Sequence, residues 1–144
     1  KYTVIEASST VREIPLETWI QNGINGEYAI FRYNMNESDS KKVVENARKF
    51  LGIPYDVQFH PSDNKMYCSE LVYKAFDRAL GVKIGKEENI SKFIEKASKV
   101  KSQKLEKMIS SRFRGKLPNH NLVTPVSQTD YLKRIKTTYD GKNE

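Results

Sequence analysis

The sequence predicts an α+β fold in a single domain, and three observations lead to that expectation. Two short runs rich in aromatic and β-branched residues, 2–7 and 28–33, are typical of strands. Two segments, 38–51 and 68–80, carry apolar residues at helical spacing and are each followed by a glycine. The chain has 144 residues, which suits one hydrophobic core, so we expect one domain over residues 1–144.

Turn residues define the N-terminal elements. The strand at 2–7 ends at a polar turn, 8–10, and Pro15 begins a short helix expected over 15–21. Proline favours the first helical position because its fixed φ suits a helix and the N–H that it lacks has no partner there. The segment 22–26, rich in asparagine and glycine, then separates this helix from the second strand.

The remaining elements follow from capping and breaking signals. Side-chain oxygens of Ser38-Asp-Ser40 are expected to cap the helix at 38–51, and Gly52 with Pro54 ends it. A loop is expected over 56–65, followed by a helix over 68–80 that a glycine closes. A turn or short helix is expected at 124–125 and a last strand over 131–139.

Charge is unevenly distributed along the chain. Residues 1–81 hold 10 Lys or Arg against 11 Asp or Glu, whereas residues 82–144 hold 15 against 7. In the basic segment, about 87–116, lysines alternate with apolar residues, which predicts one or two amphipathic helices over 87–113 with a solvated lysine face. The alternative is a surface that contacts an anionic polymer or membrane. No aromatic run accompanies the lysines, which disfavours a nucleic-acid partner.

Composition excludes several classes of protein. A single cysteine rules out an internal disulfide, and with only two distant histidines it also rules out a zinc knuckle or ribbon, so we predict no metal or cofactor. No apolar run approaches the ~18–20 residues that a membrane span needs. The chain begins at Lys1 and runs directly into an apolar segment, so we expect a further segment upstream. The sequence therefore leaves the cellular compartment of the protein undecided.

The cysteine lies where a loop is expected to become a helix. Cys68 stands in Met66-Tyr-Cys-Ser-Glu70, immediately before the apolar spacing of the helix at 68–80. The partial positive charge of a helix start favours a thiolate, and the first backbone N–H groups are available to an oxyanion. These conditions suit a nucleophile. The alternative is a small buried side chain at a helix end.

Two motifs give the sequence a family resemblance. Gly52-Ile-Pro-Tyr-Asp56 followed by Tyr67-Cys-Ser-Glu-Leu-Val72 resembles the YaeF/YiiX family of permuted papain-like enzymes, a branch of the NlpC superfamily of cysteine peptidases and amidases. The resemblance covers most of residues 2–128. Five further pieces fall in the family's order: Val4-Ile-Glu-Ala7, Pro15-Leu-x-x-Trp-Ile20, the strand at 28–32, the helix at 38–51 and Val123-Thr-Pro125.

The resemblance implies a circularly permuted papain-like (NlpC-type) fold in which a small antiparallel sheet packs against helices. Carried over residue by residue, it makes Cys68 the nucleophile and Glu6 the third member of a triad, which orients an imidazole and stabilises its charged form. Tyr55 and Tyr67 occupy positions that line the family's cleft, so we expect them to contact substrate. Each is alternatively a half-buried tyrosine whose hydroxyl is satisfied by backbone.

The catalytic histidine that the family resemblance implies is not visible in this sequence. In the family it precedes the strand that carries the glutamate, yet none of the five residues before Glu6 is histidine. Either an upstream segment supplies it, which we expect, or the protein is an inactive homologue. His60 and His120 lie in polar loops, and we expect surface roles for both.

The resemblance predicts a cysteine hydrolase that cleaves an amide or isopeptide bond, in cell-envelope peptides, through a thioester. It also suggests a secreted or cell-envelope location. Two alternatives stay open. One is a catalytically inactive binding module that uses the cleft or the basic helices to hold an anionic polymer or membrane. The other is a hydrolase or transferase of lipid acyl groups.

Overall fold

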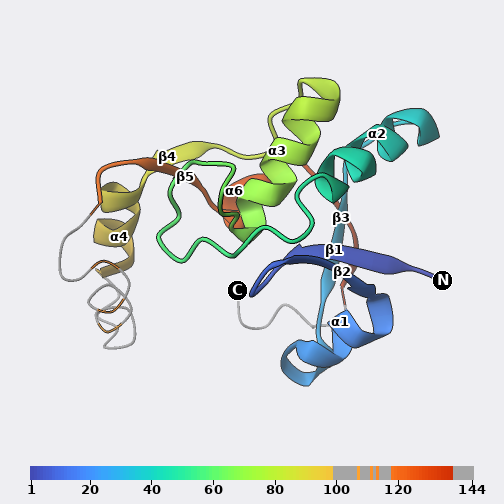
Figure 1. Cartoon of the computed structure of the whole chain (residues 1–144), viewed down its shortest axis with the longest axis horizontal. Helices are drawn as coiled ribbons and strands as arrows, with labels where there is room; N and C mark the ends of the chain where they lie inside the picture. The colour runs from blue at the N-terminus through green and yellow to red at the C-terminus, as the bar shows by residue number, and fades with distance from the viewer. Residues whose placement is uncertain (99–106, 108–110, 112, 114–117, 138–144) are drawn as a thin grey trace.

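The computed structural model describes residues 1–98, 107, 111, 113 and 118–137, and Figure 1 shows how its elements are arranged. In chain order the helices and strands are β1 Thr3–Ala7, β2 Val11–Pro15, α1 Leu16–Asn22, a 3-10 turn Ile24–Gly26, β3 Ala29–Arg32, α2 Glu37–Arg48, α3 Cys68–Leu80, β4 Glu87–Asn89, α4 Ile90–Ser98, β5 Asn121–Val123, α6 Pro125–Thr129 and β6 Lys133–Thr137.

The strands form three antiparallel pairs within the described residues. β1 pairs with β2 as a hairpin, β3 with β6, and β4 with β5. The α+β class is therefore confirmed, but the small sheet takes the form of three separate two-stranded ribbons. β2 was not predicted from the sequence, because its strand form depends on pairing with β1. The last strand, β6, lies inside the predicted range 131–139.

The long helix α2 begins and ends earlier than its sequence predicted. Its N-cap is Asn36, whose Oδ1 accepts a hydrogen bond of 2.8 Å from the Asp39 N–H, so Ser38 lies within the first turn. The helix ends at Arg48, and tight turns carry the chain through Leu51 to Gly52, which has a φ of +88°. The α-helix ends one turn early because the N–H groups of residues 49–51 bond to carbonyls three residues back, which makes tighter turns than an α-helix.

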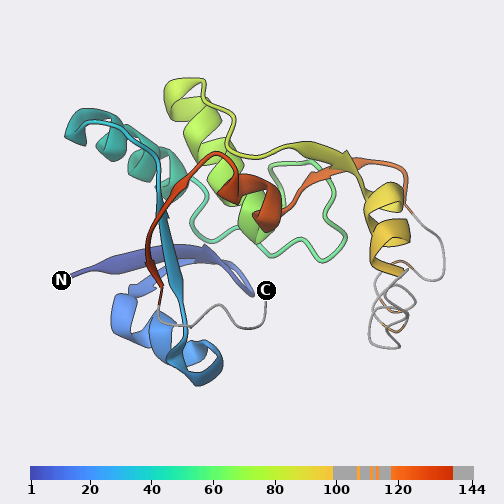
Figure 2. The ribbon, with the colours of Figure 1, turned by 180° about the vertical axis from the view of Figure 1, so that it is seen from behind.

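Two hydrophobic clusters meet at the start of α3. The first packs the β1–β2 hairpin and α2 against α3, and its buried members are Ala7, Val11, Phe50, Met66 and Leu71. The second joins the same region to α4 and β5, and its buried members are Tyr67, Ile90, Ile94, Phe113 and Leu122. Tyr55 packs against both clusters. Seen from behind in Figure 2, α6 lies close to α3 and α4 stands apart at the far end.

The basic segment is only partly described. It begins as β4, and the helix predicted from residue 87 starts instead at Ile90, because 87–89 pair with β5. Most of the rest of 87–116 lies outside the described residues. Where the structure is described, no helix is both long and apolar enough to cross a membrane.

Candidate active site

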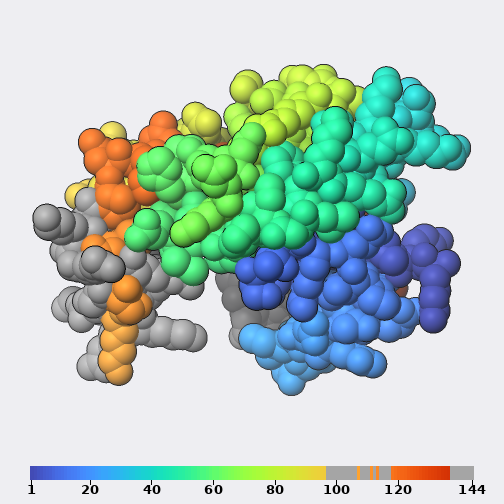
Figure 3. All heavy atoms as spheres, in the orientation of Figure 1, coloured from blue at the N-terminus to red at the C-terminus, as the bar shows by residue number. Residues whose placement is uncertain are grey.

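Cys68 is the first residue of α3, as its sequence position predicted, and its side chain is exposed. The preceding loop runs toward β4 and β5 and returns to the helix start, and Figure 3 shows it in green across the front of the molecule. The first helical hydrogen bond joins the Leu71 N–H to the Tyr67 carbonyl at 3.1 Å. The N–H groups of residues 68–70 therefore precede the helical ladder, where an oxyanion can accept from them.

Buried hydrogen bonds fix the start of α3 onto β5 and α6. The Ser69 hydroxyl donates to the Val123 carbonyl at 2.6 Å, and the Val123 N–H donates to the Tyr67 hydroxyl at 3.1 Å. The Gln128 side-chain amide donates to the carbonyls of Ser69 and Ile84 at 2.8 and 3.1 Å. All of these groups lie out of water, where an unpaired partner is costly, so the backbone on both sides of Cys68 has a fixed orientation.

Glu70 is a buried carboxylic acid in the first turn of α3, two residues after the cysteine. Its side chain is 4% exposed, and Oε2 forms an ion pair of 3.2 Å with Lys74 Nζ. Its Oε1 has no hydrogen-bond partner among the described residues. Burial raises the pKa of Glu70 to about 7, against the opposing effects of Lys74 and of a hydrogen bond from the Tyr67 backbone. That backbone bond is half of a capping box, since Glu70 is the third helical residue.

A pocket of about 310 Å³ lies against Cys68. Its wall is built from the start of α3, the preceding loop, α4, and the passage from β5 into α6. The lining residues are Phe59, Tyr67, Cys68, Ser69, Ile90, Phe93, Ile94, Phe113, Leu122, Val123, Thr124, Pro125 and Val126. The exposed sulfur therefore stands at the edge of a hollow that is apolar in nearly all of its surface.

The two tyrosines predicted to contact substrate lie in different places. Tyr67 lines the pocket, but it is buried and its hydroxyl already accepts from Val123. Burial raises the pKa of Tyr67 to about 12. Tyr55 is half-buried, bridges to Met66 through its backbone and packs between the two hydrophobic clusters. Tyr67 therefore meets the pocket through its ring, and Tyr55 is not one of the residues that line it.

Glu6 lies on β1 and is not among the residues that line the Cys68 pocket. Its Oε1 accepts from Arg12 on β2, at 2.8 Å from Nε and 2.6 Å from Nη2. Side chains alternate along a strand, so Glu6 faces away from the side on which its neighbours Ile5 and Ala7 pack toward α3. The structure thus brings Tyr67 together with Cys68 and gives Glu6 a cation as its nearest partner.

The two histidines come together although they are far apart in the sequence. The rings of His60 and His120 have centroids 4.9 Å apart. His120 Nε2 lies 3.2 Å from the Gln58 carbonyl, and the buried Asp56 carboxylate accepts from the backbone N–H groups of Gln58 and His60. These contacts hold the loop before Cys68 to the strand β5. Both histidines lie in loops, as expected, and neither lines the Cys68 pocket.

Sequence reasoning missed most of the pocket wall. None of Phe93, Leu122 and Val126 was predicted to line a site. Only Val123-Thr-Pro125 was singled out, and those residues do border the cysteine. A pattern search along one segment does not find a wall that several distant segments build together.

Cys68 begins a helix that packs against an antiparallel hairpin, and this arrangement is typical of papain-like proteins. The sequence comparisons agree. Residues 1–129 match the family described as permuted papain-like amidase enzyme, YaeF/YiiX, C92 family, and the chain belongs to that family. This confirms the resemblance drawn from the two motifs.

Two relatives can be compared with the chain directly. YiiX of Escherichia coli (strain K12), described as uncharacterized, is 36% identical over 92 residues, which are 62% of this chain and 46% of that protein. The chain thus spans about half the length of this relative. The crystal structure of YiiX from Escherichia coli O157:H7 superposes with a TM-score of 0.85 at 27% identity, covering 95% of this chain and 76% of that one.

The YiiX protein of that crystal structure is described as a metalloprotein. In the present chain, the described residues include no group of three or more histidine, cysteine, aspartate or glutamate side chains placed to hold a metal ion. The donors within the described ranges therefore do not form a metal centre by themselves.

Proposed function

We propose that the protein is a cysteine hydrolase that cleaves an amide bond through Cys68. The observation that carries the proposal is an exposed sulfur at the first residue of a 13-residue helix, at the edge of a pocket able to receive a substrate. The aligned peptide dipoles of α3 favour negative charge at this end, on the sulfur and on an oxyanion beside it. Membership of a family of papain-like amidases supports the same chemistry.

The proposed reaction has two stages. The Cys68 thiolate attacks the carbonyl carbon of the substrate, and the oxyanion that forms accepts hydrogen bonds from N–H groups at the start of α3. The C–N bond breaks, the amine leaves with a proton from an imidazole, and a thioester remains on the sulfur. Water then attacks the thioester, releases a carboxylic acid and restores the thiol.

Glu6 is proposed to orient that imidazole, as the family resemblance implies. The resemblance places the histidine before β1 in the family's order. Peptides of the cell envelope are the substrate class that the resemblance favours, with a matching location at the envelope or outside the cell. The pairing of Glu6 with Arg12 sets a condition on this role, since the carboxylate must serve both groups or exchange one for the other.

A second candidate is a catalytically inactive binding module. It is favoured by one observation: among the described residues, no histidine lines the Cys68 pocket. Such a module would hold its ligand in the pocket, or an anionic surface through the basic segment, without turnover. If the basic segment holds an anionic surface, the protein should bind anionic vesicles, and this binding should weaken steeply with added salt.

Labelling of Cys68 separates the two candidates. The full chain is treated with iodoacetamide at mildly acidic pH, and the rate of alkylation is compared with that of glutathione under the same conditions. A hydrolase whose thiolate is stabilised by α3 should react at least about tenfold faster than the free thiol. Alkylation as slow as that of glutathione contradicts the hydrolase and supports the module.

A further inference from the structure

The chemistry of the pocket wall points to one part of the substrate. Within the part of the chain that the structure describes, none of the residues that line the pocket carries a charged side chain. Val126 and Phe93 are 78% and 39% exposed, so apolar side chains also border its opening. Large apolar side chains left in water beside a reactive group are typical of a binding surface.

Apart from the Cys68 thiol, the polar side chains described in this wall are already hydrogen-bonded within the protein. The Ser69 hydroxyl and the Tyr67 hydroxyl are bonded to the two backbone groups of Val123. The Thr124 hydroxyl accepts from the Ser127 N–H at 3.2 Å. A charged or strongly polar ligand would lose its water here and find few new partners, whereas an apolar ligand loses nothing by entering.

We propose that the pocket binds an apolar acyl chain of the substrate, with the reacting carbonyl at Cys68 Sγ. The inference rests on the proposed function, because the sulfur marks where that carbonyl lies. The substrate class is then an N-acyl amide, or the matching ester, with an alkyl acyl group. A volume of about 310 Å³ stands at the small end of ligand pockets, which run from about 300 to 1,000 Å³, and suits a chain better than a large head group.

The acyl side is assigned because it stays bound through both stages of the reaction. When Sγ bonds to the carbonyl carbon and the C–N or C–O bond breaks, the amine or alcohol leaves with a proton, and the acyl group remains as a thioester. A pocket that holds the acyl chain therefore positions the carbonyl for the attack of the thiolate and again for the attack of water.

The binding step can be tested without turnover. The full chain carrying Cys68→Ala is titrated with acetamide, butanamide, hexanamide and octanamide, and binding is followed by calorimetry or NMR. Each added methylene that enters the pocket should tighten binding by about fourfold. Affinity that does not change along the series overturns the inference.

The chemical step gives a second test on the unmodified chain. Cys68 is acylated with p-nitrophenyl esters from acetate to octanoate, the products are read by mass, and each rate is divided by that of glutathione. The normalised rate should rise with chain length. Val126→Lys should lower the octanoate-to-acetate ratio several-fold, while Ile24→Lys, at an apolar residue that is 84% exposed but does not line the pocket, should leave it unchanged.

The two tests separate failure of this inference from failure of the proposed function. If the amides bind with increasing affinity but no ester acylates Cys68, the pocket stands and the hydrolase proposal falls. If every ester acylates Cys68 at the same normalised rate, the cysteine chemistry stands and the acyl pocket is overturned.

Discussion

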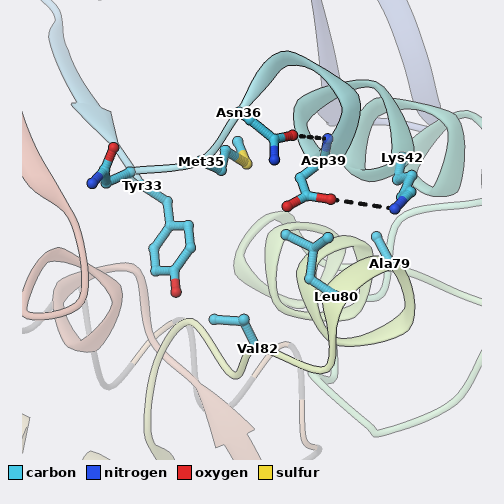
Figure 4. A pocket seen from close by; sticks show the side chains of 9 residues that line it. Tyr33, Met35, Asn36, Asp39, Lys42, Ala79, Leu80 and Val82 are labelled. Atoms are coloured by element: carbon cyan, nitrogen blue, oxygen red, sulfur yellow. Dashed lines mark hydrogen bonds and ion pairs between the residues drawn. The ribbon is translucent and has the colours of Figure 1, made fainter.

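The two ends of α3 border two hollows of opposite chemistry. At its start lies the pocket of about 310 Å³ beside Cys68, with an apolar wall. At its end, Ala79 and Leu80 border a hollow of about 630 Å³ whose other walls are mostly polar, and Figure 4 shows its side chains. In that hollow Asp39 and Lys42 are paired with each other at 3.3 Å.

The comparison teaches that the volume of a hollow does not identify the candidate active site, because the larger hollow is not the one beside the cysteine. The larger hollow lies at the negative end of the helix dipole and offers no cysteine among its lining residues. The smaller one combines an exposed sulfur, the positive end of the dipole and a wall that repels water. Of the two ends of α3, only its start combines these three properties, so substitutions at the two ends are expected to differ in effect.

The largest expected effect comes from removing the sulfur. Cys68→Ala should lower turnover by at least about three orders of magnitude, because the thioester route is lost while the fold is kept. Lys42→Ala, in the larger hollow, is the matched control and should leave turnover within a factor of two. The measurement is amide or ester hydrolysis by the full chain, with circular dichroism to check folding. Equal losses in both variants would remove the distinction between the two ends.

Gly85 tests how tightly the start of α3 is held. Its φ is +118°, and a Cβ there would lie 2.5 Å from Val123 Cγ1 and 3.0 Å from Gln128 Cγ. Gly85→Ala should therefore lower the free energy of unfolding by about 3 kcal/mol and disturb the hydrogen bonds of Gln128.

The control for Gly85 lies at the other end of the helix. Gly81 also has a positive φ, +67°, but an added Cβ would meet nothing within 4 Å. Gly81→Ala should lower the free energy of unfolding by about 1 kcal/mol, because it adds only backbone strain. Urea unfolding measures both. A loss at Gly85 no larger than that at Gly81 would show that the packing of α6 on this region is loose.

Glu70, at the start of α3, makes the stability of the folded chain depend on pH. Its pKa is raised from 4.5 to about 7 by burial, so between these values the folded chain binds more protons than the unfolded chain. The free energy of unfolding should therefore fall as pH rises from 4.5 to 7, by about 2 kcal/mol. Glu70→Gln should flatten this decrease, as measured by urea unfolding at several pH values.

Glu37 supplies the matched control on α2. Like Glu70 it forms an ion pair with the lysine four residues later, but its side chain is 85% exposed. Glu37→Gln should change stability by no more than about 0.5 kcal/mol and should leave the fall between pH 4.5 and 7 intact. If the fall persists in Glu70→Gln, another group is responsible for it.

The sequence predicted the parts of this site that depend on local signals. The apolar spacing and the closing Gly81 placed α3, and the loop before it placed Cys68 at an exposed helix start. The strand β2 was missed because Val11–Pro15 becomes a strand only through its partner. The N-cap at Asn36 was missed because Ser38 offered an equally good local signal.

The pocket depends on contacts that no single segment encodes. Phe59, Phe93 and Val126 come from a loop, a helix and a helix start that are distant in the chain. They line one pocket in the assembled fold, in which buried bonds from Ser69 and Gln128 join β5 and α6 to the start of α3. Apolar character along one helix face is usual for a core, so only the assembled fold separates a core face from a ligand wall.

The smallest expected effect concerns Glu6, which lies on the hairpin and outside the pocket wall. If Glu6 orients an imidazole, Glu6→Gln should lower the rate of hydrolysis about tenfold, which corresponds to a barrier higher by about 1.4 kcal/mol. The affinity for amides should be unchanged. Arg12→Gln breaks the 2.6 Å ion pair but keeps the carboxylate, so it should lower stability slightly and spare the rate. Steady-state kinetics and urea unfolding of both variants give the comparison. Equal behaviour of the two variants means that Glu6 acts only within the hairpin, because a carboxylate needed by the imidazole is removed by the first substitution and retained by the second.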